Sequence, residues 1–455
     1  MEGLKRYNQA NIKIFRLRTS EPASGPQLSY RRAKTLPNMR FIHAADIHLD
    51  SPLTGLAAYP DAPAELLRTA TRDAFANLVS VAVEEKVDFL IIAGDLYDGN
   101  WKDFNTGIFF SSQMGRLKVA NIPVYLLYGN HDADSEMTRT LSLPDNVYRF
   151  PSNKAGSFRL PELKVVLHGR SFKDAATTDN LAVNYPDPVE GWLNIGVLHT
   201  ALEGNSSHAN YAPCSIAELE ARGYQYWALG HVHEYRLWRG DSVIAFPGNL
   251  QGRHIREAGP RGALLVSADG FEIGTVERLH VDVLRWHALE VDVAAASNLA
   301  EAVRLAGCAL EHLVEESGVL PLVVRVTLTG ASKAHGELFG LETQLRAEVL
   351  AHAASIGSER LWIEKLRLDT SPHAVAADVT ARLDAVADLQ ALLQRAELDP
   401  VFIQSLEEEL MQLIGKLPLE VIDALACVKA VRAGQTASLV RSIGPALLDH
   451  VAKAG

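Results

Sequence analysis

Residues 40–48 read RFIHAADIH, an apolar run that ends in a cluster of polar side chains. The same pattern returns at 87–98, VDFLIIAGDLYD, and at 122–132, IPVYLLYGNHD. Short apolar runs without alternation are typical of strands that are buried on both faces. The three stretches therefore predict three buried strands, each followed at once by polar residues.

Helical segments separate these strands. Apolar residues recur with helical spacing at 64–86 and at 108–119, and further buried strands are predicted at 193–199 and 226–229. Repeated alternation of strand and helix predicts an α/β fold that is built in layers. His43 lies inside the first strand, so we expect it to be a core residue and not a ligand.

Each predicted strand carries potential metal ligands at its carboxyl end. In open α/β sheets these ends border one crevice, so we expect the side chains to lie close together. Carboxylates and imidazoles suit divalent ions such as Mn²⁺, and no cysteine lies within these motifs. Gly94, Gly129 and Gly230 each precede a candidate at a tight turn, where a Cβ could obstruct the backbone. The candidates are Asp46, His48, Asp95, Asp98, Asn130, His131, His199, His231 and His233.

The chain divides into four expected parts. Residues 1–38 are basic and lack periodicity, which predicts a disordered leader. Residues 39–281 hold every candidate ligand and form the expected catalytic domain. Residues 282–372 predict a smaller α+β domain, and residues 373–455 predict a helical region.

Composition and charge narrow the class of protein. The chain is 47% hydrophobic and 22% charged, which is typical of a globular protein. It holds no apolar run of about eighteen residues, so no membrane span is expected. The three cysteines are scattered, which favours a reducing cytoplasm. A net charge of −11 does not attract nucleic acid, so a nuclease would need a local basic strip, metal ions or a partner.

In this order along the chain, the motifs DxH, GDxxD, GNHD, a lone His and GHxH resemble those of the calcineurin-like metallophosphoesterases. The resemblance implies a layered β-sandwich that is flanked by helices, and a site for two divalent ions, of which Mn²⁺ is the expected one. It implies that Asp46, His48 and His233 bind a first ion and that Asp95 bridges both ions. The implied ligands of the second ion are Asn130, His199 and His231. His131 resembles the residue that protonates the leaving group, and Asp98 resembles the residue that orients this histidine.

Segments 41–53, 93–98, 226–233 and 246–253 narrow the resemblance to the SbcD/Mre11 nuclease branch and, within it, to YhaO-like members. This implies a DNA exonuclease and endonuclease subunit that acts in DNA repair. The smaller α+β domain would cap the site, and the helical region would dock on an SMC-like ATPase. Dimers are common in that branch, so a homodimer is also an expected assembly.

Contact with DNA is predicted at Arg253 and Arg256, which follow a Pro-Gly-Asn turn close to a strand end. Phosphate contacts there would position a strand without reading its sequence. The alternative is a solvated loop that pairs with Glu257.

Two other functions remain open. The first is a cyclic-nucleotide or small-molecule phosphoesterase, which the residues after about 285 disfavour because such enzymes usually lack a docking region at the C-terminus. The second is a non-catalytic scaffold with the same fold, which the complete set of candidate ligands disfavours.

Overall fold

The computed structural model describes residues 38–54, 64–98, 104–134, 143–202, 211–357, 359–373, 380–414 and 426–454. The predicted leader lies outside the described residues except for Asn38. The chain divides into two compact units, Met1–Trp286 and His287–Gly455. The division falls a few residues after the expected end of the catalytic domain at residue 281.

One six-stranded sheet of the first unit has the order β12-β11-β1-β2-β3-β4. Its parallel strands are β1 (Asn38–Ala44), β2 (Phe89–Ala93), β3 (Val124–Leu127) and β4 (Val147–Arg149). The antiparallel strands β11 (Gly262–Asp269) and β12 (Glu272–His280) extend it beyond β1. The carboxyl ends of β1, β2 and β3 therefore meet at one edge of the sheet.

A second six-stranded sheet has the order β5-β6-β7-β8-β10-β9. Its four central strands, β6 (Val165–Gly169), β7 (Leu193–His199), β8 (Tyr226–Gly230) and β10 (Val243–Phe246), are parallel. The edge strands β5 (Gly156–Leu160) and β9 (Arg236–Arg239) are antiparallel to their neighbours. The parallel strands are central and fully buried, which agrees with their largely apolar sequences.

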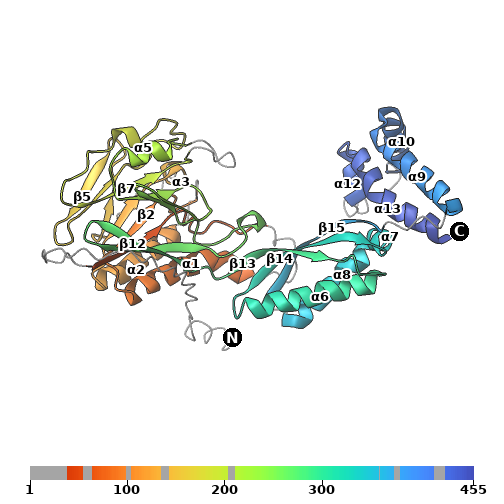
Figure 1. The fold of residues 1–455 in the computed structure, drawn as a ribbon, viewed down its shortest axis with the longest axis horizontal. Coiled ribbons are helices and arrows are strands. Elements are labelled where there is room, and N and C mark those ends of the chain that lie inside the picture. The colour runs from red at the N-terminus through yellow and green to blue at the C-terminus, as the bar shows by residue number, and fades with distance from the viewer. Residues whose placement is uncertain are drawn as a thin grey trace, which may run out of the picture. The chain divides into compact units, whose positions relative to one another are not determined.

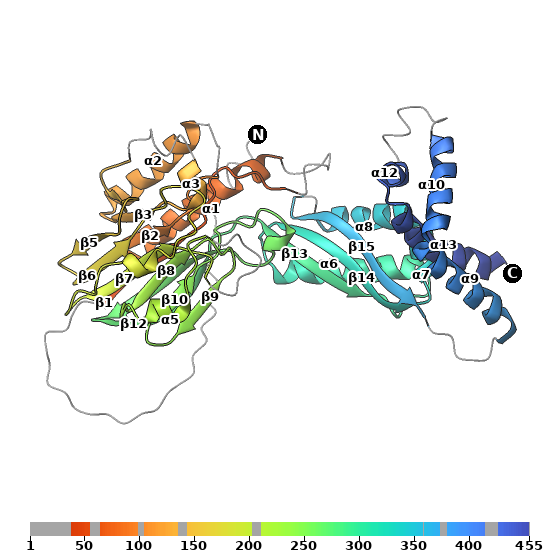
Figure 2. The ribbon, with the colours of Figure 1, turned by 90° about the horizontal axis from the view of Figure 1, so that it is seen from above.

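The two sheets pack face to face. Phe41 and Phe89 of the first sheet stack with ring centroids 4.9 Å apart, and Tyr226 of the second meets Phe41 edge-on at 5.4 Å. Helices α1 (Ala64–Glu84) and α2 (Phe104–Val119) cover the outer face of the first sheet, and the short α5 (Ile216–Glu220) lies on that of the second (Figures 1 and 2). The predicted layered α/β fold is confirmed.

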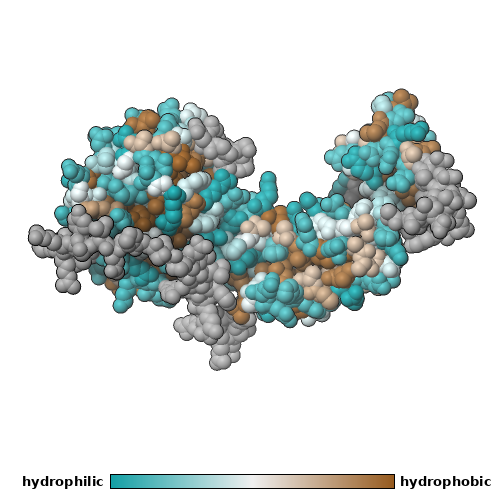
Figure 3. Space-filling view, in the orientation of Figure 1, coloured by the Kyte–Doolittle hydropathy of each residue, from teal (hydrophilic) through white to brown (hydrophobic). Residues whose placement is uncertain are grey.

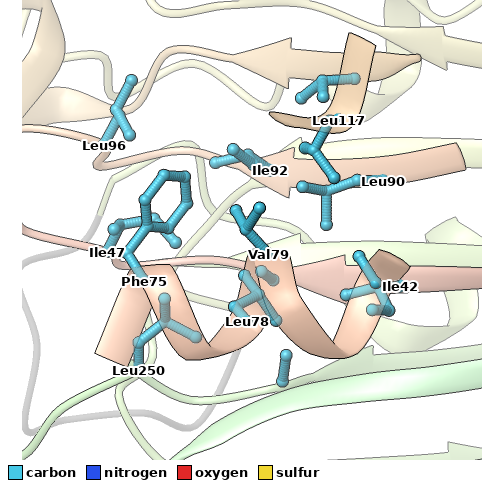
Figure 4. Packing of buried hydrophobic residues seen from close by; sticks show 14 of the residues in the cluster. Ile42, Ile47, Phe75, Leu78, Val79, Leu90, Ile92, Leu96, Leu117 and Leu250 are labelled. Carbon is cyan, nitrogen blue, oxygen red and sulfur yellow. The ribbon is translucent and has the colours of Figure 1, made fainter. Parts of the chain in front are cut away.

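Figure 4 shows why α1 adheres to the first sheet. Phe75, Leu78 and Val79 of the helix point toward Ile42 and Ile92 of β1 and β2. All five side chains are fully buried, and each contributes about 1.5–3 kcal/mol by leaving water. This packing holds the strands in register, so their carboxyl ends are rigidly placed.

The second unit contains a three-stranded sheet, and the first strand of this sheet begins just before the boundary between the units. The strands are β13 (Arg285–Asp292), β14 (Leu322–Ser332) and β15 (Leu361–Pro372), in that order, with β14 and β15 parallel. Helices α6 (Leu299–Glu316) and α8 (Glu342–Gly357) pack on one face of this sheet (Figure 2). A short helix, α7 (His335–Gly340), follows β14.

Four helices follow β15 within the described part of the second unit. They are α9 (Thr380–Leu398), α10 (Pro400–Ile414), α12 (Ala426–Arg432) and α13 (Thr436–Ala454). Ile414, Val428 and Val431 form a small buried cluster between three of them. Among the helices that the structure describes, none is long and apolar enough to cross a lipid bilayer.

Candidate metal centre

The loops after β1 and β2 carry the first candidates in strained backbone conformations. Asp46, His48 and Asp95 have φ angles of 51°, 46° and 52°, in the left-handed region that non-glycine residues seldom adopt. Hydrogen bonds between the loops hold them there, from Asp46 N to Gly94 O and from His48 N to Asp95 O, each 3.0 Å long. Such strain costs about 1–3 kcal/mol per residue and is concentrated at functional sites.

Two glycines allow the loops to approach the candidate side chains. A Cβ on Gly129 would lie 2.3 Å from Asp95 Oδ1, and one on Gly94 would lie 2.2 Å from His199 Nδ1. Gly94 also has a φ of +101°. These positions require glycine because a side chain would displace Asp95 or His199.

Asp46, His48 and His233 form one cluster of potential ligand atoms within 4.8 Å of one another. His48 Nε2 lies 3.2 Å from His233 Nε2, and Asp46 Oδ1 lies 4.0 Å from the same His233 atom. The residues come from the ends of β1 and β8, which belong to different sheets. The site therefore lies where the carboxyl ends of the two sheets meet.

Asp95, His199 and His231 form a second cluster that meets the same distance limit. His199 Nε2 lies 3.4 Å from Asp95 Oδ2 and 3.0 Å from Asn130 Oδ1. His199 Nδ1 donates to Ala93 O at 2.9 Å, so Nε2 is the nitrogen that presents a lone pair when the ring is neutral.

His131 and Asp98 lie beside these clusters. His48, Asp95 and His131 form a third set within the same limit, so this set links the first cluster through His48 to the second through Asp95. His131 Nδ1 lies 3.2 Å from Asp98 Oδ1, and His131 N donates to Asp95 Oδ1 at 3.0 Å. The hydrogen bond to Asp98 raises the pKa of His131, and the same bond lowers the pKa of Asp98. The His131 side chain is 40% exposed, so a protonated imidazole can reach a substrate.

The electrostatics of the clusters fit bound cations. Burial opposes the negative charge of Asp46 and of Asp95, and it raises the pKa of Asp46. The pKa of Asp95 is nevertheless lowered, because His199 and His48 lie nearby. Burial would also lower the pKa of His199, but Asp95 raises it to about 9. The carboxylates therefore attract positive charge into a dry site.

His48 gives a second indication that these residues are suited to bind metal ions. Burial lowers its pKa, so its ring is neutral, and its buried Nδ1 has no hydrogen-bond partner among the described residues, with Asp98 Oδ1 3.7 Å away. Its Nε2 faces another imidazole nitrogen at 3.2 Å. Imidazoles and carboxylates that converge in this way are a donor set suited to divalent metal ions.

The structure adds Glu257, to which sequence analysis gave no role beyond a loop ion pair. Glu257 is buried, and its Oε1 lies 2.8 Å from His233 Nδ1. Its carboxylate also accepts from Arg253 N at 2.8 Å and from Asn249 Nδ2 at 3.0 Å. A carboxylate on the second nitrogen of a ligating histidine fixes its tautomer and orientation. No local sequence pattern links Glu257 to His233, because the pairing depends on tertiary structure.

Asp132, the last residue of the GNHD motif, is a second addition. It is buried and accepts hydrogen bonds from the backbone of Leu96 at 3.1 Å, Tyr97 at 2.9 Å and Gly129 at 3.0 Å. Burial, together with the nearby charge of Asp95, raises the pKa of Asp132 to about 7. Asp132 thus connects the loop after β2 to the loop after β3.

Arg253 and Arg256 differ in their surroundings. The Arg253 side chain is 14% exposed and contacts Glu257 Oε1 at 3.1 Å and Ser51 Oγ at 3.2 Å. Arg253 thus pairs with Glu257, as in the alternative to DNA contact, but its side chain is partly buried and does not lie in a solvated loop. Arg256 is exposed on a single 3-10 turn, Ile255–Glu257.

Known protein families match segments of both units of the chain. The family described as "Calcineurin-like phosphoesterase" matches residues 39–235, and the one described as "Metallophosphoesterase YhaO, middle domain" matches residues 286–371. The chain is 32% identical over 302 residues to the uncharacterized metallophosphoesterase YhaO of Bacillus subtilis (strain 168), across 65% of this chain and 73% of that protein.

Two further similarities are more distant. The chain is 24% identical over 278 residues to the DNA double-strand break repair protein Mre11 of Sulfurisphaera tokodaii, across 58% of this chain and 68% of that protein. A solved structure of a dimetal phosphatase from Danio rerio has a TM-score of 0.33 and 13% identity, and the match covers 52% of this chain and 98% of that one.

Proposed function

The chain belongs to the calcineurin-like metallophosphoesterases, with YhaO among its relatives, and from this premise we propose that it is a DNA nuclease. As a member of this family it is a metal-dependent phosphoesterase. The proposed reaction is hydrolysis of DNA phosphodiester bonds with two Mn²⁺ ions during DNA repair in the cytoplasm. The similarity to a protein named for DNA double-strand break repair supports the choice of substrate.

Asp95 shares one set of close ligand atoms with His48 and another with His199 and His231, and this position supports the two-ion part of the proposal. We assign Asp46, His48 and His233 to one ion, and Asn130, His199 and His231 to the other, with Asp95 between them. Bound divalent cations would neutralise charge on the phosphate and make a water molecule easier to deprotonate.

His131 is the proposed general acid. Asp98 holds its Nδ1 side, so Nε2 is the atom that would donate a proton to the departing oxygen. The bond to Asp98 is the main cause that raises the pKa of His131, which favours the protonated ring that this role requires. Asp98 therefore acts through His131 by orienting the ring and stabilising its charged form.

The helical region is the proposed docking site of an SMC-like ATPase. Helix α10 exposes Val401 at 77% and Leu413 at 61%, and α9 exposes Leu398 at 79%. Figure 3 shows hydrophobic atoms at the surface of this helical region. Exposed apolar side chains grouped on one region favour a protein partner.

A comparison of substrates tests the proposal. Purified protein with Mn²⁺ would be offered end-labelled single- and double-stranded DNA, cyclic AMP and p-nitrophenyl phosphate. We expect nucleotide release from DNA at a rate well above turnover of the two small esters, and its loss in EDTA. Hydrolysis of the small esters without DNA cleavage would contradict the nuclease and support a small-molecule phosphoesterase. No hydrolysis of any substrate would favour a scaffold.

A further inference from the structure

A cavity of about 390 Å³ lies next to His233, and among its described lining residues His233 alone is a proposed metal ligand. Its lining includes His233, Glu234, Tyr235, Arg256, Arg261 and Arg278. We propose that this cavity is a second phosphate site, which holds a backbone phosphate of the DNA strand beside the one that is cut. The inference rests on the proposed nuclease function and specifies how that site would select a polynucleotide.

Arg261 gives the cavity a buried positive charge. Its residue is 8% exposed, and its guanidinium donates to Ala258 O at 2.8 Å, Glu257 O at 3.1 Å and Asn249 Oδ1 at 3.1 Å. It also donates to His233 O. These acceptors are neutral, so no carboxylate bonded directly to Arg261 cancels its charge. A buried guanidinium of this kind attracts an anion.

Arg278 and Arg256 add two further cations to the lining of the cavity. The Arg278 guanidinium lies over the Tyr235 ring, 4.6 Å from its centroid, and donates to Pro260 O at 3.0 Å. These contacts hold it in one place, which lowers the entropy lost when it binds a phosphate. Arg256 is exposed and can turn toward the same anion.

The acidic residues at the cavity do not cancel these cations. Glu234 is exposed and pairs with Arg236 at 3.2 Å. The Glu257 carboxylate is engaged by His233 at 2.8 Å and by Arg253 at 3.1 Å. The cavity is therefore a local basic site on a chain whose net charge is −11.

His233 connects the cavity to the ligand clusters. Its Nε2 faces His48 at 3.2 Å, while its backbone oxygen accepts a hydrogen bond from Arg261. A phosphate in the cavity would thus lie about one side chain away from the site of hydrolysis. A phosphomonoester has one phosphate and cannot occupy both places, whereas a DNA strand can.

Binding of a fluorescein-labelled oligonucleotide of about ten nucleotides, measured by anisotropy in EDTA, tests the second phosphate site without cleavage. We expect Arg256→Ala and Arg278→Ala each to weaken binding about tenfold, as for loss of one charge-assisted hydrogen bond. Each should also reduce the slope of log affinity against log salt by about one. Arg159→Ala is the matched control, because it removes the same charge from β5 at the opposite edge of the second sheet.

The outcomes separate this inference from the proposed function. If both variants bind like Arg159→Ala, or if the wild type does not bind the oligonucleotide, the second phosphate site is wrong. If binding depends on Arg256 and Arg278 but the wild type cuts no DNA with Mn²⁺, the nuclease proposal is wrong and the phosphate site stands. Arg256 is exposed, so its variant should fold even if Arg278→Ala does not.

Discussion

Replacement of Glu257 with glutamine removes one negative charge from the shell around His233 and changes the size of the side chain very little. In the wild type, the Glu257 carboxylate lies 2.8 Å from His233 Nδ1 and 3.1 Å from Arg253 Nη2, and the Glu257 side chain is 6% exposed. In the variant an amide oxygen could still accept one hydrogen bond, but Arg253 would lose its counter-ion.

The expected cost has two parts. Removal of one partner from a buried ion pair costs about 3–5 kcal/mol, and we expect the lower end because the amide retains a hydrogen bond. Loss of a carboxylate that orients a ligating histidine lowers metal affinity by about 10–100-fold. Glu257→Gln should therefore reduce both the free energy of unfolding and the affinity for Mn²⁺.

Glu364→Gln is the matched control. Glu364 pairs with Arg325 through contacts of 2.6 and 2.8 Å, with the Glu364 side chain 10% exposed, and it belongs to the second unit, which contains none of the proposed ligands. Urea unfolding should show a loss for both variants, and calorimetric titration with Mn²⁺ should show a loss for Glu257→Gln alone. Unchanged metal affinity in Glu257→Gln would refute the role given to this carboxylate.

Three other changes have defined outcomes. Asp95→Ala should abolish metal binding and hydrolysis together, as measured by metal content and by turnover of a p-nitrophenyl ester; a variant that still binds two ions would contradict the bridging assignment. Burial lowers the pKa of His43 from about 6.5 to about 3, so the unfolded chain binds a proton between these values while the folded chain does not. Stability should therefore fall as pH decreases from 6.5 toward 3, and the urea midpoint of His43→Gln should fall less steeply over that range; parallel curves would refute this. Deletion of the residues after Pro372 should preserve metal content but weaken binding to the ATPase in a pull-down, and unchanged association would exclude the docking role.

The sequence predicted the layered fold because burial of the central strands leaves a direct mark on it. The run 87–93 is almost wholly apolar, and β2 is fully buried. The predicted helix 64–86 corresponds to α1, Ala64–Glu84. Hydrophobic periodicity reports such elements because the interior excludes water.

The candidate ligands were also visible in the sequence, since each directly follows a buried strand. The structure brings the candidates from both sheets into overlapping clusters. His43, expected to be a core residue, is buried and bonded to Tyr226 Oη and Leu229 O, each at 3.0 Å.

Residues that support the ligands were harder to find. Glu257 lies 24 residues from His233 in the sequence. Asp132 lies 35 residues from Tyr97, whose backbone N–H donates a hydrogen bond to it. Their roles depend on how loops from different strands meet, and no local pattern encodes that. Arg253 was predicted to contact DNA because it follows a turn close to a strand end, and the structure shows it partly buried and paired with Glu257.

Release of nucleotides from end-labelled DNA with Mn²⁺, with wild type and His131→Ala compared side by side, tests the central claim most directly. The account predicts that wild type cuts DNA and that His131→Ala loses about 10²–10⁴-fold in rate while it retains its metal ions. Near-wild-type cleavage by His131→Ala would contradict the general-acid assignment. Failure of the wild type to cut DNA, with small esters still hydrolysed, would contradict the nuclease itself.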